Sequence, residues 1–323
     1  MKRTLIALAC LASTAAFAQS NVTIYGRLNT TVEYQKNIDS TDAKTVLQNN
    51  ASRLGFKGTE DLGGGLKALF MIEHRFNSDT GTAATEFWSG DAFVGVQTPY
   101  GTVRAGRITS PAYYATADYV SLHNHDTGTS EDKLYVAASS PKNTVAYLTP
   151  TFGGLNAEFA ASAGEGTDAA KSWQIAVNYD AGALHLGAGY DENDPGDKQV
   201  ALRALYEMGA FTFGGYYQLA DSVDLGKRNS VRGSLQYTMG ASEFHVNVGW
   251  ADEWDDADES GAIQYTVGYN YNLSKRTKVY AFYTAVKNDS GAAYGIATNA
   301  DGSPKVTFGK DPSSFAVGVR HNF

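Results

Sequence analysis

The sequence has one cysteine, Cys10, and only seven prolines among its 323 residues. Without a second cysteine no disulfide can form within the chain, and no thiol chemistry is available after residue 10. Long apolar runs are also missing, so no segment beyond the first residues reaches the about 18 apolar residues of a spanning helix. Basic residues are in deficit, because 26 lysines and arginines stand against 34 aspartates and glutamates. This balance argues against nucleic acid as a partner.

The first 18 residues have the pattern of a secretory signal peptide. A charged start, an apolar stretch and a small-x-small cleavage site follow one another as Lys2-Arg3, Leu5–Ala15 and Ala16-Phe17-Ala18. The apolar stretch is too short for a membrane anchor, and a lipoprotein signal at Cys10 would leave too little apolar sequence before it. We predict cleavage after Ala18, which removes the cysteine and changes the formal charge from −8 to −10.

Glycine, tyrosine and phenylalanine are abundant, with 34, 20 and 15 residues. Aromatic residues favour strands, and glycine favours tight turns. Most of the chain alternates apolar and polar residues with a period of two, as in its last segment, Phe315–Phe323. Sixteen such segments are present, most of them about 8–12 residues long, close to the length of a tilted strand that crosses a bilayer. A mean hydropathy of −0.30 is consistent with this, because only every second residue of such a strand faces lipid.

These segments predict an all-β fold: a 16-stranded antiparallel transmembrane β-barrel in which residues 19–323 form a single domain. Short turns such as Ala181-Gly182 alternate with longer polar connections, which we expect near residues 37–48, 79–87, 109–141, 191–198, 221–228, 252–260 and 288–311. A soluble β-sandwich would not sort its loops to two ends in this way. The pattern therefore favours an outer-membrane location.

The longest irregular connection, about residues 109–141, is predicted to fold into the barrel as a constriction loop. A barrel of this size leaves an aqueous channel, so inward charges should be solvated. We expect a basic side made by Arg53, Arg75 and Arg104, and an acidic side on the loop made by Asp118, Asp126, Glu131 and Asp132. Such an arrangement creates a transverse field that orients dipoles and screens ions. Further lumen-lining residues are Arg27, Lys57, Arg203, Arg232 and Arg320.

No metal site, cofactor or catalytic centre is predicted. His123 and His125 lack a third ligand, so a solvated pair is the better interpretation. The run Asp252–Glu259 lacks the glycine-centred spacing of a calcium loop, and we interpret it as an acidic external loop that could bridge to lipopolysaccharide through divalent cations. No histidine has a nucleophile and an orienting group at strand spacing, which argues against an enzyme.

Several segments resemble the Gram-negative general porins of the beta-proteobacterial and neisserial type: Ser52–Ala68, Ala92–Val96 followed by Gly101–Arg107, Asn270–Thr277 and Val317–Phe323. The resemblance extends over the whole chain. It implies a 16-stranded trimeric channel whose third external loop folds inward to set the pore size, with the terminal Phe323 as an assembly signal. Members of this family commonly carry an arginine where this chain has Ala146, and Lys142 would substitute for it in part. The sign of ion selectivity therefore stays open.

The sequence thus predicts an outer-membrane channel for passive diffusion of small hydrophilic solutes and ions. A solute-selective porin with a weak binding site on the loop, and a plugged structural or adhesin barrel, are the alternatives. The expected partners are outer-membrane lipid, lipopolysaccharide, further copies of the chain in a homotrimer, and the machinery that assembles outer-membrane proteins.

Overall fold

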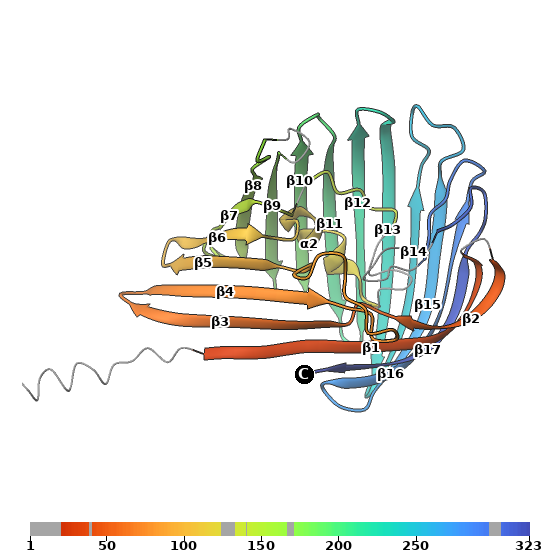
Figure 1. The fold of residues 1–323 in the computed structure, drawn as a ribbon, viewed down its shortest axis with the longest axis horizontal. Helices are drawn as coiled ribbons and strands as arrows, with labels where there is room; N and C mark the ends of the chain where they lie inside the picture. Colours follow the sequence, from red (N-terminus) through yellow and green to blue (C-terminus); the bar gives the residue numbers. More distant parts are fainter. Residues whose placement is uncertain (1–20, 39–40, 124–132, 140, 167–170, 297–304) are drawn as a thin grey trace, which may run out of the picture.

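The computed structural model describes residues 21–38, 41–123, 133–139, 141–166, 171–296 and 305–323. The predicted signal peptide and its cleavage site lie outside these residues. Seventeen strands in this part of the chain form one antiparallel sheet (Figure 1). They are β1 (Asn21–Ile38), β2 (Thr41–Asn49), β3 (Arg53–Gly63), β4 (Leu66–Arg75), β5 (Ala92–Thr98), β6 (Gly101–Arg107), β7 (Thr144–Leu148), β8 (Leu155–Ser162), β9 (Ser172–Ala181), β10 (Leu184–Asn193), β11 (Lys198–Met208), β12 (Phe211–Ser222), β13 (Gly226–Met239), β14 (Ser242–Ala251), β15 (Ala262–Asn272), β16 (Thr277–Asn288) and β17 (Ser313–Asn322).

The sheet closes on itself through β1. One edge of β1 pairs with β17, and its other edge pairs with β2 over Thr30–Ile38 and with β3 over Asn21–Arg27. Strands β2 and β3 are therefore two halves of one barrel strand, interrupted at residues 50–52. The result is a closed 16-stranded barrel, which confirms the fold class predicted from the sequence.

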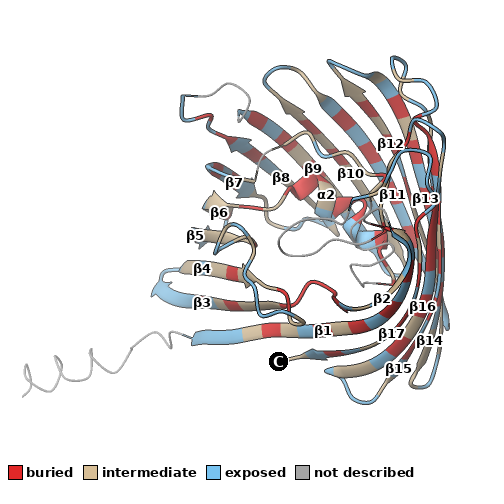
Figure 2. Cartoon of the chain, turned by 45° about the vertical axis from the view of Figure 1, so that its right-hand side comes forward, coloured by how far each residue is buried: buried red, intermediate tan, exposed pale blue. Residues whose placement is uncertain are grey.

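The two faces of each strand differ in the way that a barrel in hydrocarbon requires. In β1, Leu28 and Val32 are 46% and 55% exposed, whereas Asn29, Thr31 and Glu33 on the opposite face are at most 1% exposed. The same alternation of exposed and buried residues continues around the barrel wall (Figure 2). Apolar side chains outside and polar side chains inside reverse the order of a soluble protein, because lipid rather than water surrounds the wall.

Tight turns join the strands at the end of the barrel where Asn21 and Phe323 lie. Three of these turns have the same two residues, Gly-Ala, at 182–183, 209–210 and 240–241. Their glycines have φ angles of +61°, +60° and +61°. Two-residue hairpin turns need a positive φ to match the twist of the strands, and glycine adopts that angle at little cost.

Three connections predicted to be long are shorter than expected because strand residues occupy much of them, so those predictions were wrong. Strand β2 occupies most of the segment 37–48, and the loops near 191–198 and 221–228 shrink to residues 194–197 and 223–225. Here the ladder continues through segments that are rich in polar residues and lack a regular alternation of apolar and polar side chains, so the period-two signal disappears before the hydrogen bonding ends. Longer connections remain at residues 76–91, 108–143, 252–261 and 289–312.

The connection between β6 and β7, residues 108–143, is called here the β6–β7 loop. Its described residues include two short helical segments, α2 (Pro111–Ala115) and η1 (Asp118–Val120). No helix in the described ranges is long and apolar enough to cross a membrane.

Candidate functional site

The start of the β6–β7 loop packs on the inner face of β9 and β10 (Figure 2). Ser110 caps α2 by accepting a hydrogen bond from the Tyr113 N–H at 3.2 Å, and its hydroxyl donates to Gln174 on β9 at 2.8 Å. Ala112 is fully buried against Gly189 of β10, where an added Cβ would lie 2.8 Å from the Ala112 Cα. A proline in the first turn and a serine cap favour a helix at this point, and the glycine leaves room for it.

Arg203 on β11 also contacts this segment of the loop. Its Nε donates to the Ala115 carbonyl at 2.9 Å, and its guanidinium lies 3.6 Å from the centre of the Tyr119 ring. The residue is 3% exposed, and Arg232 and Arg320 are 2% and 8% exposed. These three arginines point inward, but they are buried rather than solvated as expected. For Arg203 the reason is visible, because the loop covers it.

The later described parts of the loop lie against β12 to β16. The His123 ring is buried and packs edge-on against His245 on β14 and Phe282 on β16, at centroid distances of 5.6 and 5.1 Å. Leu134 is buried with Ala251 and Val286 among others. The Val136 N–H donates to Gln218 at 2.9 Å. The described parts of the loop therefore lie mainly against β9 to β16, and Tyr114 lines a hollow together with residues of β1, β3 and β4.

On that wall, register places two of the predicted arginines directly opposite each other. Arg53 and Arg75 are partners in the ladder between β3 and β4. Glu73 lies between them, with its Oε1 3.8 Å from Arg53 Nη1 and 3.2 Å from Arg75 Nε, and its Oε2 accepts from the Tyr25 hydroxyl at 3.2 Å. Arg53, Glu73 and Arg27 line a hollow of about 450 Å³ that also reaches Tyr114.

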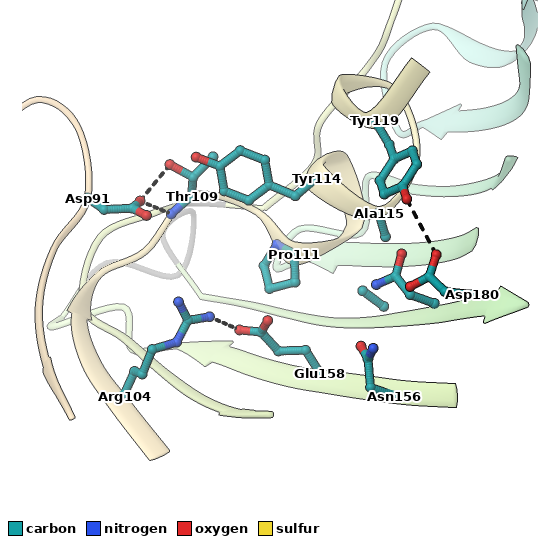
Figure 3. A pocket seen from close by; sticks show the side chains of 12 residues that line it. Asp91, Arg104, Thr109, Pro111, Tyr114, Ala115, Tyr119, Asn156, Glu158 and Asp180 are labelled. Atoms are coloured by element: carbon teal, nitrogen blue, oxygen red, sulfur yellow. Dashed lines mark hydrogen bonds and ion pairs between the residues drawn. The ribbon is translucent and has the colours of Figure 1, made fainter. Parts of the chain in front are cut away.

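A second hollow of about 280 Å³ lies between α2 and the strands β6, β8 and β9 (Figure 3). Here Arg104 forms an ion pair with Glu158. Thr109 donates its N–H and its hydroxyl to Asp91 Oδ1 at 2.8 and 2.7 Å. The Tyr119 hydroxyl donates to Asp180 at 3.4 Å. Asp91 and Tyr114 line both hollows, so the two are neighbours.

Of the predicted acidic side, only Asp118 can be placed. It is exposed at the start of η1, whereas Asp126, Glu131 and Asp132 lie outside the described residues. Burial, together with the Asp91 and Asp118 carboxylates, raises the pKa of the Tyr114 phenol, and Arg75 acts against this rise. The Tyr114 hydroxyl therefore lies within electrostatic reach of both signs of charge.

The structure also shows the surroundings of Ala146, the position where the resemblance led us to expect an arginine. Ala146 is the ladder partner of Arg104, is 1% exposed and packs with Ile108 and Ala160. Lys142 forms an ion pair with Glu86 in the connection between β4 and β5. Lys57, another predicted lumen residue, is exposed, with its Nζ 5.2 Å from the centre of the Tyr25 ring.

Glu73, Asp91, Glu158 and Asp180 were not among the residues that we expected at the constriction from the sequence. The alternation of the sequence can predict the face of the strand on which each carboxylate lies. Only the register between strands shows which arginine, if any, it contacts. Tyr114 and Tyr119 carried no signal, because the loop has no period. Within the residues that can be described, no group of three or more metal-binding side chains is arranged to hold an ion.

Comparisons with known proteins agree with this barrel architecture. The family model of Gram-negative porins matches residues 4–291. Outer membrane porin protein 32 of Delftia acidovorans is 32% identical, and the major outer membrane protein P.IB of Neisseria meningitidis serogroup B is 27% identical, each over 100% of both chains.

Among solved structures, the anion-selective porin from Comamonas acidovorans is 28% identical with a TM-score of 0.82, covering 94% of this chain and 100% of that one. The trimer form of OmpT from Vibrio cholerae is similar in fold alone, with 18% identity, a TM-score of 0.72 and coverage of 94% and 99%. A closed barrel, polar inside and apolar outside, thus coincides with a family match over most of the chain. The protein belongs to the Gram-negative porin family and forms a channel in the outer membrane.

Proposed function

We propose that this porin passes small hydrophilic solutes and ions by passive diffusion, through the gap between the β6–β7 loop and the wall of β1, β3 and β4. The observation that carries this proposal is Arg53, the ladder partner of Arg75, which lines a hollow that Tyr114 of the loop also lines. The side chains of Arg53 and Arg75 are 23% and 32% exposed, so they remain in contact with water in the lumen.

The charges at this gap favour weak ion selectivity. Glu73 offsets part of the charge of Arg53 and Arg75, and Glu158 offsets Arg104. Asp118 on the loop and Asp180 on β9 add negative charge on the side of the gap away from β1, β3 and β4. The similar porin from Comamonas acidovorans is described as anion-selective. We propose a weaker anion preference here, because Ala146 supplies no charge and a carboxylate accompanies each of Arg53, Arg75 and Arg104.

The reversal potential under a salt gradient in planar bilayers tests this proposal. For Arg53→Ala we expect a shift toward cation preference, because Glu73 loses one of its two arginine neighbours and the lumen loses a positive charge. Arg276→Ala is the matched control, because Arg276 is exposed in the turn between β15 and β16. An unchanged reversal potential for Arg53→Ala would remove this residue from the constriction.

The current recorded in the same planar-bilayer experiment distinguishes the alternative functions. A plugged structural or adhesin barrel predicts no current, and a solute-selective porin predicts a current that one class of solute reduces. The relatives are porins, which are channels rather than enzymes, and we propose no catalytic role for this chain.

We further propose a homotrimer, supported by the solved trimer of similar fold. Cleavage after Ala18, recognition of Phe323 by the assembly machinery, and contact of the external loops with lipopolysaccharide complete the proposal.

A further inference from the structure

Arg228 is an inward arginine near the start of β13, at the end of the barrel opposite the Gly-Ala turns. It is 2% exposed, and its guanidinium joins two connections that are far apart in the sequence. Its Nη2 donates to the Leu134 carbonyl of the β6–β7 loop at 2.5 Å. Its Nη1 donates to the Tyr294 hydroxyl in residues 289–312, which we call the β16–β17 connection. The planar fork of a guanidinium allows one side chain to hold both partners.

Tyr294 is itself held in position for this contact. The side-chain oxygen of Asn288 accepts from the Tyr294 N–H at 3.0 Å, and the Asn288 side-chain amide donates to the Tyr294 carbonyl at 3.0 Å. The Arg228 Cζ lies 5.6 Å from the centre of the Tyr294 ring and 4.7 Å from that of Trp254, between β14 and β15. Cation–π contacts therefore add to the hydrogen bonds at this junction.

Apolar packing joins the same two connections. Leu134 of the β6–β7 loop and Ile296 of the β16–β17 connection are buried in one cluster with Ile38, Ala251 and Val286 among others. Tyr294 packs against this cluster. The β16–β17 connection therefore shares an apolar core with the β6–β7 loop, and removal of that surface from water favours their association.

Further contacts lead from Leu134 to the constriction. The ring of the next residue, Tyr135, packs edge-on against Tyr113 of α2, with the ring centres 5.5 Å apart. The Tyr135 hydroxyl lies 3.2 Å from the Oγ1 of Thr116, at the end of α2. Tyr114, between these two residues, lines the larger hollow. A continuous series of contacts thus joins the guanidinium to the wall of the gap.

We propose that Arg228 is a positioning residue through which the β16–β17 connection fixes the place of α2, so that both connections together set the width of the channel. This inference rests on the proposed function and adds a second connection to the constriction. Loss of the Tyr294 hydroxyl would leave a buried guanidinium N–H without its acceptor, which weakens the junction. A network of packed and hydrogen-bonded side chains can carry such a change to a distant element.

Hydrogen–deuterium exchange of the full barrel in lipid vesicles tests this coupling. For Tyr294→Phe, which removes one hydroxyl and keeps the ring, we expect the amides of residues 112–116 to exchange about threefold to tenfold faster. Tyr217→Phe is the matched control, because it also removes one hydroxyl hydrogen bond, to Asn229 at 2.7 Å, but on the outer face of the wall. This control should leave the exchange of residues 112–116 unchanged.

Arg228→Lys provides an independent variant. A lysine keeps the positive charge but lacks the fork that reaches Leu134 and Tyr294 together, so exchange of residues 112–116 should again increase. Adding Tyr294→Phe to Arg228→Lys should cause no further increase, because both changes break the same junction. A double-variant effect equal to the product of the two single effects would show that the residues act independently and would overturn the proposal.

Single-channel recordings in planar bilayers separate this inference from the function on which it rests. We expect a noisier open-channel current for Tyr294→Phe than for the natural chain and Tyr217→Phe. If the natural chain passes no current, the proposed function fails. If current flows but exchange increases only in residues 289–296 and not in residues 112–116, Arg228 fixes only its own connection and this inference alone is overturned. Equal current noise in all three proteins overturns it as well.

Discussion

Arg53, Arg104 and Arg203 all lie on the inner face of the barrel, yet their surroundings differ. Arg53 borders a hollow and shares Glu73 with Arg75, Arg104 is paired with Glu158, and Arg203 is buried under the loop. The same residue type can therefore line a hollow, pair with a neighbouring carboxylate or hold a loop in place. A guanidinium has five donors in a planar fork, which lets Arg203 contact the Ala115 and Leu186 carbonyls at the same time.

His123 is the residue whose charge state should control the docking of the loop. Burial, with His245 nearby, lowers the pKa of His123 well below its ordinary value of 6.5. The docked loop thus binds a proton less readily than the undocked loop. Docking is then fully stable above pH 6.5 and should weaken as the pH falls below that value, by about 1.4 kcal/mol per pH unit until the docked pKa is reached.

Hydrogen–deuterium exchange of residues 118–123 measures this effect. We expect exchange of these amides, after correction for intrinsic rates, to increase between pH 7 and pH 5 in the natural chain. In His123→Gln the increase should be absent, since glutamine does not titrate in this range. Equal acid-induced increases in both proteins would exclude His123 as the cause.

At the scale of elements, α2 and β10 show how a loop is positioned on a barrel wall. Gly187 and Gly189 are two residues apart on β10 and so face the same side, and an added Cβ would lie 2.3 Å from the Ala115 carbonyl oxygen or 2.8 Å from Ala112. Close packing of α2 on the wall therefore depends on glycine, which has no side chain, at positions 187 and 189.

Gly189→Ala should displace α2 toward the lumen. The added methyl group overpacks the contact with Ala112, at a cost of about 1–3 kcal/mol in loop docking. We expect a smaller and noisier single-channel conductance, while the barrel still folds. Gly233→Ala is the matched control, because an added Cβ there meets nothing within 4 Å. Conductance that is the same in both variants would show that α2 does not narrow the channel.

At the scale of the whole molecule, closure depends on the seam between β1 and β17. The last residue takes part in it, because Phe323 and Gly26 exchange two backbone hydrogen bonds of 3.0 and 3.1 Å. The Phe323 ring covers Gly26, where an added Cβ would lie 2.4 Å from it. A strand of the barrel thus ends on an aromatic residue that fills the space above a glycine.

Deletion of Phe323 should therefore destabilise the barrel more than Phe323→Ala. The alanine variant keeps both backbone hydrogen bonds and loses only the ring, whereas the deletion also loses the bonds, at about 1 kcal/mol each. Urea unfolding of the purified barrel in lipid vesicles measures the difference. If the two variants unfold at the same urea concentration, the terminal hydrogen bonds do not contribute to closure.

The amino-acid sequence by itself determined the number of barrel strands, the separation of an apolar from a polar face along each strand, and the family. These follow from alternation along a strand, which is a local property of neighbouring residues and of the solvent on each side. It did not reveal β2, because the adjacent Val46 and Leu47 place one apolar residue on each face of an otherwise mostly polar segment, so no alternation is visible.

Only the tertiary structure decided which charges are paired, buried or open to the lumen. The contacts of Arg104 with Glu158 and of Arg203 with Ala115 join residues 54 and 88 positions apart. Such contacts depend on the register between strands and on where the β6–β7 loop docks. Neither is a property of one segment of the chain. The period of the sequence therefore predicts that a residue lies on the inner face, but it does not predict which residue it contacts there.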